Sequence, residues 1–269
     1  MRLEGSTVIV TGAGSGIGRA LSVELARAGA ELMLVGRRRD VLEETRNLFP
    51  PGPDAEIVTA DLTLGADRVR VRDRAMAAFS GLDLLVNNAG IMDAATFAAT
   101  SDGMMERMLA TNLMAPFALT RELLPLLQAG GAPRIVNMGS LLGDIAMPNF
   151  AGYAATKFAL RGLSDALRRE LKPMGIGVTY VAPRATRTEG LDQIAHFVDT
   201  KGTKLDDPQL LARRIVGAIE RGRRYLYPSG AERLFLLVQR FAPALIDRSV
   251  STRTQEPQGQ SPIPQISSR

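Results

Sequence analysis

The sequence predicts an α/β fold in which a doubly wound parallel sheet of about seven strands forms a single domain. Three observations predict it. Short β-branched runs alternate with longer stretches of helical periodicity, which is typical of βαβ units. Several strand candidates, such as the run LMLV at 32–35, are apolar at successive positions, which suits strands covered by helices on both faces. Residues 1–228 contain neither an internal repeat nor a linker.

The elements follow one another in regular order. Seven segments are predicted as strands: Thr7–Thr11, Glu31–Val35, Glu56–Ala60, Leu82–Asn87, Arg134–Met138, Ile176–Val181 and Tyr225–Tyr227. Six stretches between them are predicted as helices: 17–28, 40–48, 64–79, 103–128, 151–172 and 208–220. Residues 1–229 therefore form the predicted domain, and the polar segment 186–205 is interpreted as a lid over a substrate.

The C-terminal part of the chain differs from this domain. Residues 230–248 place Leu234, Val238 and Phe241 at helical spacing and predict an apolar helical extension that Pro243 kinks or ends. This extension packs on its own domain, pairs with another subunit or lies on a membrane surface, and the sequence leaves all three open. The Ser, Thr, Gln and Pro content of 249–269 predicts a disordered tail.

Composition excludes several kinds of site. The absence of cysteine rules out disulfides and thiolate metal sites, and a single histidine, His196, rules out a multi-histidine site, so no metal is expected. The net charge is +5, but the arginines are dispersed and aromatic residues make up only 5%, which argues against nucleic acid binding. No signal peptide or membrane span is expected. The predicted location is the cytoplasm, with peripheral membrane contact through 230–248 left open.

A glycine-rich segment, TGAGSGIG, follows the first predicted strand and contains Gly12, Gly16 and Gly18. A turn of this kind between a strand and a helix lets backbone amides approach a pyrophosphate at the N-terminus of the helix. Taken alone, the segment indicates either a dinucleotide site or a plain tight turn.

The spacing TGxxxGxG resembles the short-chain dehydrogenase/reductase family of classical type. Further motifs appear in the order that the family shows: NNAG at 87–90, Asn112 in TNLM, Ser140 in NMGS and YAATK at 153–157. The resemblance covers roughly residues 3–228. It implies a Rossmann fold and an oxidoreductase that transfers a hydride between a nicotinamide and a carbonyl or alcohol substrate.

The resemblance also implies catalytic roles. Tyr153 and Lys157 lie four residues apart and share a helix face, and the ammonium is expected to lower the pKa of the phenol. Tyr153 is the implied general acid and base, and Lys157 also holds the ribose of the cofactor. Ser140 is implied to bind the substrate oxygen, and Asn112 to anchor a water in a proton relay.

The end of the second strand bears on which cofactor is used. Enzymes of this class that use NAD usually carry an acid there, but this chain has Gly36 followed by Arg37 and Arg38. Because a guanidinium binds a 2′-phosphate, NADP(H) is favoured over NAD(H), with Arg37 as the main contact; the alternative is a solvated basic loop. Asp40 and Glu43 have the spacing of a capping box, which predicts a helix that starts after the arginines.

The cofactor contacts implied by the resemblance extend over several loops. Thr188 is preferred to Thr186 for the carboxamide, and Asp61 is interpreted either as an adenine contact or as a helix N-cap. The complete predicted set is Gly12, Ser15, Gly16, Ile17, Gly18, Arg37, Arg38, Asp61, Leu62, Asn88, Ala89, Gly90, Tyr153, Lys157, Pro183 and Thr188.

One position departs from the family pattern. Pro183 is followed by Arg184 where the family usually has glycine, so the arginine must tolerate the same backbone conformation or change the local path. His196, in the predicted lid, is interpreted as a surface group. A set of apolar residues near the catalytic motifs indicates either an apolar substrate or ordinary core: Met92, Leu141, Leu142, Met147 and Phe150.

Three functions compete. The leading prediction is an NADP(H)-dependent carbonyl reductase or alcohol dehydrogenase that works on a small molecule as a homodimer or homotetramer. The second is a non-catalytic NADP(H)-binding regulator or scaffold. The presence of suitable residues at all four catalytic positions argues against it. The third is an epimerase or dehydratase of a related extended family, which generally needs a longer chain for its substrate domain. The substrate and the direction of the reaction are not predicted.

Overall fold

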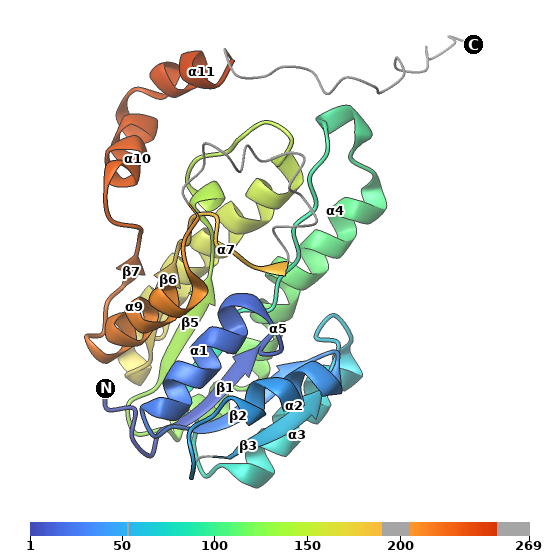
Figure 1. Ribbon diagram of the computed structural model, residues 1–269, viewed down its shortest axis with the longest axis vertical. Helices are drawn as coiled ribbons and strands as arrows, with labels where there is room; N and C mark the ends of the chain where they lie inside the picture. The colour runs from blue at the N-terminus through green and yellow to red at the C-terminus, as the bar shows by residue number, and fades with distance from the viewer. Residues whose placement is uncertain (53, 190–204, 252–269) are drawn as a thin grey trace.

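The computed structural model describes residues 1–52, 54–189 and 205–251. Its centre is one sheet of seven parallel strands in the order β3-β2-β1-β4-β5-β6-β7 (Figure 1). The strands are β1 (Thr7–Thr11), β2 (Glu31–Gly36), β3 (Ala55–Thr59), β4 (Leu84–Asn87), β5 (Arg134–Met138), β6 (Gly177–Val181) and β7 (Tyr225–Leu226). The predicted fold class is confirmed, and the strand bounds differ from the predicted ones by no more than one or two residues.

Helices cover both faces of the sheet. They are α1 (Gly16–Arg27), α2 (Arg39–Asn47), α3 (Gly65–Ala78), α4 (Asp102–Leu109), α5 (Ala115–Glu122), α6 (Leu124–Gln128), α7 (Ala151–Glu170), α9 (Pro208–Glu220), α10 (Ala231–Phe241) and α11 (Pro243–Ser251). Short helical turns lie between them: η1 (Phe97–Ala99), η2 (Ala110–Met114), η3 (Leu141–Gly143) and η4 (Lys172–Met174).

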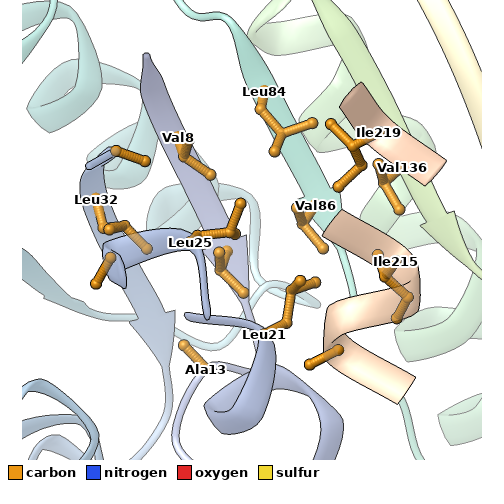
Figure 2. Packing of buried hydrophobic residues seen from close by; sticks show 14 of the residues in the cluster. Val8, Ala13, Leu21, Leu25, Leu32, Leu84, Val86, Val136, Ile215 and Ile219 are labelled. Carbon is orange, nitrogen blue, oxygen red and sulfur yellow. The ribbon is translucent and has the colours of Figure 1, made fainter. Parts of the chain in front are cut away.

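The core consists of two main apolar clusters, one on each face. Val8 and Val10 of β1 belong to the cluster beneath α1, α2 and α9, whereas Ile9 belongs to the cluster beneath α3, α5, α6 and the end of α7. Successive strand side chains point to opposite faces, so a strand covered on both faces must be apolar at every position. Figure 2 shows the first cluster, in which Leu21 and Ile215 bring α1 and α9 together over the strands.

Strand β1 is where the winding of the sheet reverses. It pairs with β2 on one side and with β4 on the other, and the chain builds the sheet outward in both directions from there. Parallel sheets bind ligands at the carboxyl ends of the strands at such a switch point. The glycine-rich turn after β1 and the NNAG segment after β4 therefore meet at one edge.

The predicted helix 103–128 is wrong as a single helix. It is divided into α4, the π-helical turn η2, α5 and α6, and the amide of Ala115 donates to the carbonyl of Ala110, five residues back. Pro116 and Pro125 lie in the first turns of α5 and α6, where the missing N–H removes a donor from the helical pattern. The π-helical turn contains Asn112.

The predicted capping box is also wrong. Helix α2 begins at Arg39, with Arg38 at the N-cap position and no side-chain capping bond. Glu43 instead accepts a hydrogen bond of 2.8 Å from Nε of Arg39, so its carboxylate pairs within the helix and does not cap it. Only Arg37 and Arg38 precede the helix.

The C-terminal extension consists of two short helices. Helix α10 ends at Phe241 and α11 begins at Pro243, as the position of that proline predicted, and the pair extends away from β7 (Figure 1). Within the described ranges, no helix is long and apolar enough to cross a membrane. Most of the predicted lid (190–204, with His196) and of the predicted tail (252–269) lie outside the described residues. The predicted domain limits remain predictions.

Candidate active site

The turn after β1 has little room for side chains. Gly12 has a φ of +64°, and a Cβ there would lie 2.9 Å from Cα of Ala89. A Cβ on Gly18 would lie 2.1 Å from the carbonyl oxygen of Gly12 and 2.5 Å from Nδ2 of Asn88. The glycines therefore let the NNAG segment pack directly on the turn.

Hydrogen bonds from Thr11 and Asn88 fix this packing. Oγ1 of Thr11 accepts from the backbone amides of Asn88 and Ala89, at 2.9 and 3.0 Å. Nδ2 of Asn88 donates to the carbonyls of Thr11 and Gly12, at 2.9 and 3.1 Å. The side chain of Asn88, a predicted cofactor contact, thus holds the turn in shape.

Arg19 is a further support that the sequence did not indicate. Its Nε and Nη2 donate to the carbonyl of Gly14, at 3.0 and 2.6 Å, and Nη2 also contacts Glu44 at 2.9 Å. An exposed-looking arginine on a helix gives no local sign of such a partner, which is set by the path of the turn.

These features fit the pyrophosphate of a dinucleotide. Helix α1 starts directly after the turn, with Ser15 at its N-cap position and Ile17 in its first turn. Ser15 makes no side-chain capping bond, so the first amides of α1 are not capped by its hydroxyl. Free amides at a helix N-terminus, beside a backbone without side chains, suit an anionic group.

The adenosine end of the predicted site is basic. Arg37 and Arg38 are exposed after β2, and Nη2 of Arg38 lies 3.9 Å from Oε2 of Glu189. Oδ1 of Asp61 accepts hydrogen bonds from the amide and hydroxyl of Thr63, at 3.0 and 2.7 Å. The hydrogen bond from the Thr63 hydroxyl, with smaller contributions from the Thr63 amide and then the charge of Arg37, outweighs burial and holds the pKa of Asp61 below its usual range.

Two predictions about this region can be refined. The interpretation of Asp61 as a helix N-cap is wrong, because Leu64 occupies the N-cap position of α3 and Asp61 caps the turn before it. The side chain of Leu62 is buried in the core, so any contact it makes with a cofactor comes from its backbone.

The predicted catalytic residues meet on the other side of β4. Nζ of Lys157 donates to the carbonyl of Met138 at 2.9 Å and lies 5.6 Å from the centre of the Tyr153 ring. Ser140 follows β5, and its side chain lies close enough to the Tyr153 hydroxyl to lower the pKa of the phenol. The structure thus brings Ser140, Tyr153 and Lys157 together from the end of β5 and the start of α7.

Asn112 joins this group from the π-helical turn. Its Oδ1 accepts from the amide of Ile91 at 2.9 Å, and its Nδ2 donates to the Ile91 carbonyl at 2.9 Å and to Oγ1 of Thr156 at 3.1 Å. A Cβ on Gly90 would lie 3.2 Å from Oδ1 of Asn112 and 3.6 Å from Nζ of Lys157. Gly90 therefore lies at the point where the nucleotide turn and the catalytic group meet.

The two titrating groups have strongly shifted pKa values. Burial raises the pKa of Tyr153 to about 12, against the opposing effect of its hydrogen bond with Ser140. Burial lowers the pKa of Lys157 to about 8. The expected lowering of the Tyr153 pKa is wrong in this structure, because the cost of burying a phenolate dominates and Lys157 is not among the groups that shift it.

Tyr180 of β6 was not identified from the sequence. Its fully buried hydroxyl donates to the carbonyl of Ser140 at 3.3 Å and accepts from the Ser140 amide at 3.4 Å. A Cβ on Gly139 would lie 2.1 Å from the Tyr180 ring, and one on Gly143 would lie 2.5 Å from its hydroxyl oxygen. The two glycines flanking Ser140 in MGSLLG leave the space that Tyr180 fills, and their spacing is the signal that could have found it.

The segment after β6 closes the site. The amide of Leu141 donates to the carbonyl of Pro183 at 2.9 Å. Thr188 lies against the glycine-rich turn, since a Cβ on Gly16 would be 2.9 Å from its Cγ2, whereas Thr186 is buried and donates to the Arg184 carbonyl. Thr188 thus lies at the nucleotide turn, and its contact with the carboxamide stays a prediction.

Arg184 fits the chain without left-handed backbone. Among the described residues other than glycine, a positive φ occurs at Asn149 alone. The arginine therefore replaces the usual glycine without strain of that kind, and its guanidinium contacts Asp206 and Glu232.

The apolar residues near the site divide into two groups. Phe150, Met92 and Leu142 belong to a small cluster that also includes Ala185 and Leu205. Met147 is exposed instead. Across the described part of the chain, no three acidic, histidine or cysteine side chains gather as a metal site would require.

Comparisons with known proteins identify the family of this chain. The family model of the short chain dehydrogenases matches residues 6–198. Ketoacyl reductase HetN of Nostoc is 30% identical over 253 residues, which cover 91% of this chain and 88% of the relative. A short-chain dehydrogenase of Sphingobium yanoikuyae in complex with NADPH is 28% identical, with a TM-score of 0.77 over 95% of this chain and 98% of that one. A 3-ketoacyl-(acyl-carrier-protein) reductase of Brucella melitensis complexed with NADH is 29% identical, with a TM-score of 0.76 over 83% and 96%.

Proposed function

We propose that this chain, which belongs to the short-chain dehydrogenase family of oxidoreductases, is an NADP(H)-dependent enzyme that interconverts a carbonyl and an alcohol. The observation that carries the proposal is the convergence of Ser140, Tyr153, Lys157 and Asn112 beside the glycine-rich turn. A nicotinamide cofactor, when bound, supplies or accepts the hydride.

Tyr153 is the proposed proton donor and acceptor. With a pKa of about 12 the phenol keeps its proton near neutral pH, so it is ready to protonate a carbonyl oxygen during reduction. The hydroxyl of Ser140 donates to the same oxygen and stabilises the negative charge that develops there. Oxidation of an alcohol instead needs the phenolate, which burial disfavours.

Lys157 and Asn112 complete the proposed proton path. The ammonium of Lys157 holds the ribose of the cofactor and, with a pKa of about 8, changes its charge close to neutral pH. Pro116, four residues after Asn112, has no N–H to donate to the Asn112 carbonyl. This carbonyl is the proposed anchor for the relay water.

The preference for NADP(H) rests on this chain's own residues. One solved relative is in complex with NADPH and another with NADH. Similarity to them therefore supports a nicotinamide cofactor but does not distinguish NADP(H) from NAD(H). Arg37 and Arg38 lie exposed after Gly36, where they can pair with a 2′-phosphate. Ser15, Ile17 and Thr188 are the proposed contacts to the phosphates and the carboxamide.

An apolar ketone is the proposed substrate, and a homo-oligomer the proposed assembly. The cluster around Phe150 and the ketoacyl reductase among the relatives support the first. Exposed Met114, Phe117 and Phe158 on η2, α5 and α7 support the second, since contacts between subunits favour such residues. A cytoplasmic location remains a proposal, as does peripheral membrane contact through the exposed apolar side chains of α10.

The test is an NADPH-oxidation screen against ketones, aldehydes, acyl-chain ketones, steroids and sugars, repeated with NADH. We expect turnover with at least one apolar carbonyl class and faster turnover with NADPH. Tight NADPH binding without turnover in any class would favour the scaffold function instead. Equal rates with the two cofactors would contradict the NADP(H) preference alone.

A further inference from the structure

Arg184 forms two ion pairs in a largely buried setting. Its Nε and Nη2 donate to Oδ1 of Asp206, at 2.8 and 2.5 Å, and its Nη1 donates to Oε1 of Glu232. The Arg184 and Asp206 side chains are only 15% and 14% exposed, and Glu232 is 26% exposed. The bond to Asp206 chiefly, with help from Glu232, raises the pKa of Arg184, so the guanidinium stays charged.

The ion pair of Arg184 with Asp206 connects it to the chain that flanks residues 190–204. The amide of Asp206 donates to the Ala185 carbonyl at 2.9 Å, and its carbonyl accepts from the Arg187 amide at 3.0 Å. A bridge between Thr186 and Asp206 lies between these bonds. Arg184 thus ties the chain before residues 190–204 to the chain after them. It lies three residues before Arg187 and four before Thr188, which contacts the nucleotide turn at Gly16.

The ion pair of Arg184 with Glu232 connects it to the C-terminal helices. Glu232 lies in the first turn of α10, and Ile246 of α11 is buried. A hollow separates the two parts further along: Ala146, Pro148 and Phe158 line it from the catalytic loop and α7, and Gln239, Ile246 and Val250 line it from α10 and α11. The loop at 146–148 joins Ser140 to the start of the helix that carries Tyr153.

We propose that Arg184 is a positioning residue with two separable arms. Through Asp206 it sets the segment that carries Thr188 over the nucleotide turn. Through Glu232 it holds α10 and α11 beside the loop at 146–148, where they form an outer wall of the substrate-binding region. This inference rests on the proposed reductase function. The wall is expected to contact only those substrates that are long enough to reach it.

The kinetic test uses four full-length variants, each assayed with NADPH, a short ketone and a ketone with a long apolar chain. Glu232→Gln is expected to raise KM for the long ketone roughly tenfold, with KM for NADPH and for the short ketone unchanged. Asp206→Asn is expected to raise KM for NADPH roughly tenfold and to leave the ratio of long to short ketone unchanged. Arg184→Gln combines both effects. Arg233→Gln, at an exposed neighbour of Glu232, is the matched control and changes neither.

Trypsin cleavage within α10 and α11 supplies a readout that does not need activity. Cleavage is expected to speed up in Glu232→Gln and Arg184→Gln but not in Asp206→Asn, while Glu232→Asp keeps the wild-type rate. If Glu232→Gln leaves both the dependence on ketone chain length and the cleavage rate unchanged, the proposed role of the Arg184–Glu232 pair is wrong. If Arg184→Gln, Asp206→Asn and Glu232→Gln all lower kcat equally for every substrate, Arg184 has a structural role only. A wild-type protein without turnover would contradict the proposed function. The NADPH affinity of Asp206→Asn and the cleavage rate of Glu232→Gln would then still test the two proposed roles of Arg184.

Discussion

The two sides of the candidate site are held in different ways. On the nucleotide side, Gly12 and Gly18 allow backbone to pack on backbone, and the short side chains of Thr11 and Asn88 fasten it. On the substrate side, a long side chain such as Arg184 crosses between elements that are far apart in the sequence. The first arrangement depends on local chain geometry, and the second on partners chosen by the fold. The first can therefore be predicted from a short stretch of sequence, and the second cannot.

The largest expected effect comes from removing one atom on the substrate side. Tyr153→Phe should lower kcat by about a thousandfold, because the general acid is lost, while NADPH affinity stays within twofold. Steady-state kinetics and NADPH fluorescence titration measure the two quantities. Tyr225→Phe, in β7, is the matched control and should keep wild-type turnover. Full activity in Tyr153→Phe would overturn the catalytic assignment.

A glycine substitution tests the nucleotide side. In Gly18→Ala the new Cβ would meet the Gly12 carbonyl at 2.1 Å, so the turn must shift. Overpacking of this kind costs about 2 kcal/mol, which corresponds to roughly thirtyfold in NADPH affinity. Gly162→Ala is the matched control, since a Cβ there meets nothing within 4 Å. An unchanged NADPH affinity in Gly18→Ala would mean that the turn is not the pyrophosphate site.

The same contrast explains which predictions succeeded. The strands were predicted well because strands buried on both faces must be apolar at successive positions, as in β2. The glycine-rich turn was recognised because its spacing is local. The predicted helix 103–128 was wrong because a proline is compatible with the first turn of a helix, and Pro116 lies in the first turn of α5. Nothing in the apolar pattern shows that a new helix begins at that point.

The missed supports share one cause. Tyr180 lies in a strand where any large apolar residue would fit the pattern, and only the packing of Gly139 and Gly143 gives its hydroxyl a role. Arg184 was noted as a departure, but its partners lie 22 and 48 residues further along the chain. Local periodicity carries no information about pairs of that separation.

A charge reversal sharpens the description of the adenosine end. Arg37→Asp should shift the ratio of kcat/KM for NADPH over NADH by roughly tenfold toward NADH, because a carboxylate repels a 2′-phosphate and can bind a ribose hydroxyl. Arg39→Gln is the control, since Arg39 lies inside α2 and pairs with Glu43. A ratio that does not move in Arg37→Asp would leave these arginines as a solvated loop.

A smaller effect is expected where Tyr180 supports Ser140. Tyr180→Phe removes hydrogen bonds to the Ser140 backbone and should cost about 1 kcal/mol, or roughly fivefold in kcat, with KM for NADPH unchanged. Thermal unfolding of the same variant reports how much of the loss is stability. A wild-type kcat together with a lowered melting temperature would show that Tyr180 stabilises the fold without positioning Ser140.

The smallest effect is a pH dependence that belongs to the substrate side alone. Because burial lowers the pKa of Lys157 to about 8, its ammonium is present below that pH and is lost as the pH rises through it, whereas Tyr153, at about 12, stays protonated. The rate of carbonyl reduction should therefore be level near neutral pH and fall about twofold by the pKa of Lys157. In Lys157→Arg the charge is permanent, so the fall near pH 8 should disappear even if the overall rate is lower, and a fall that persists would assign it to another group.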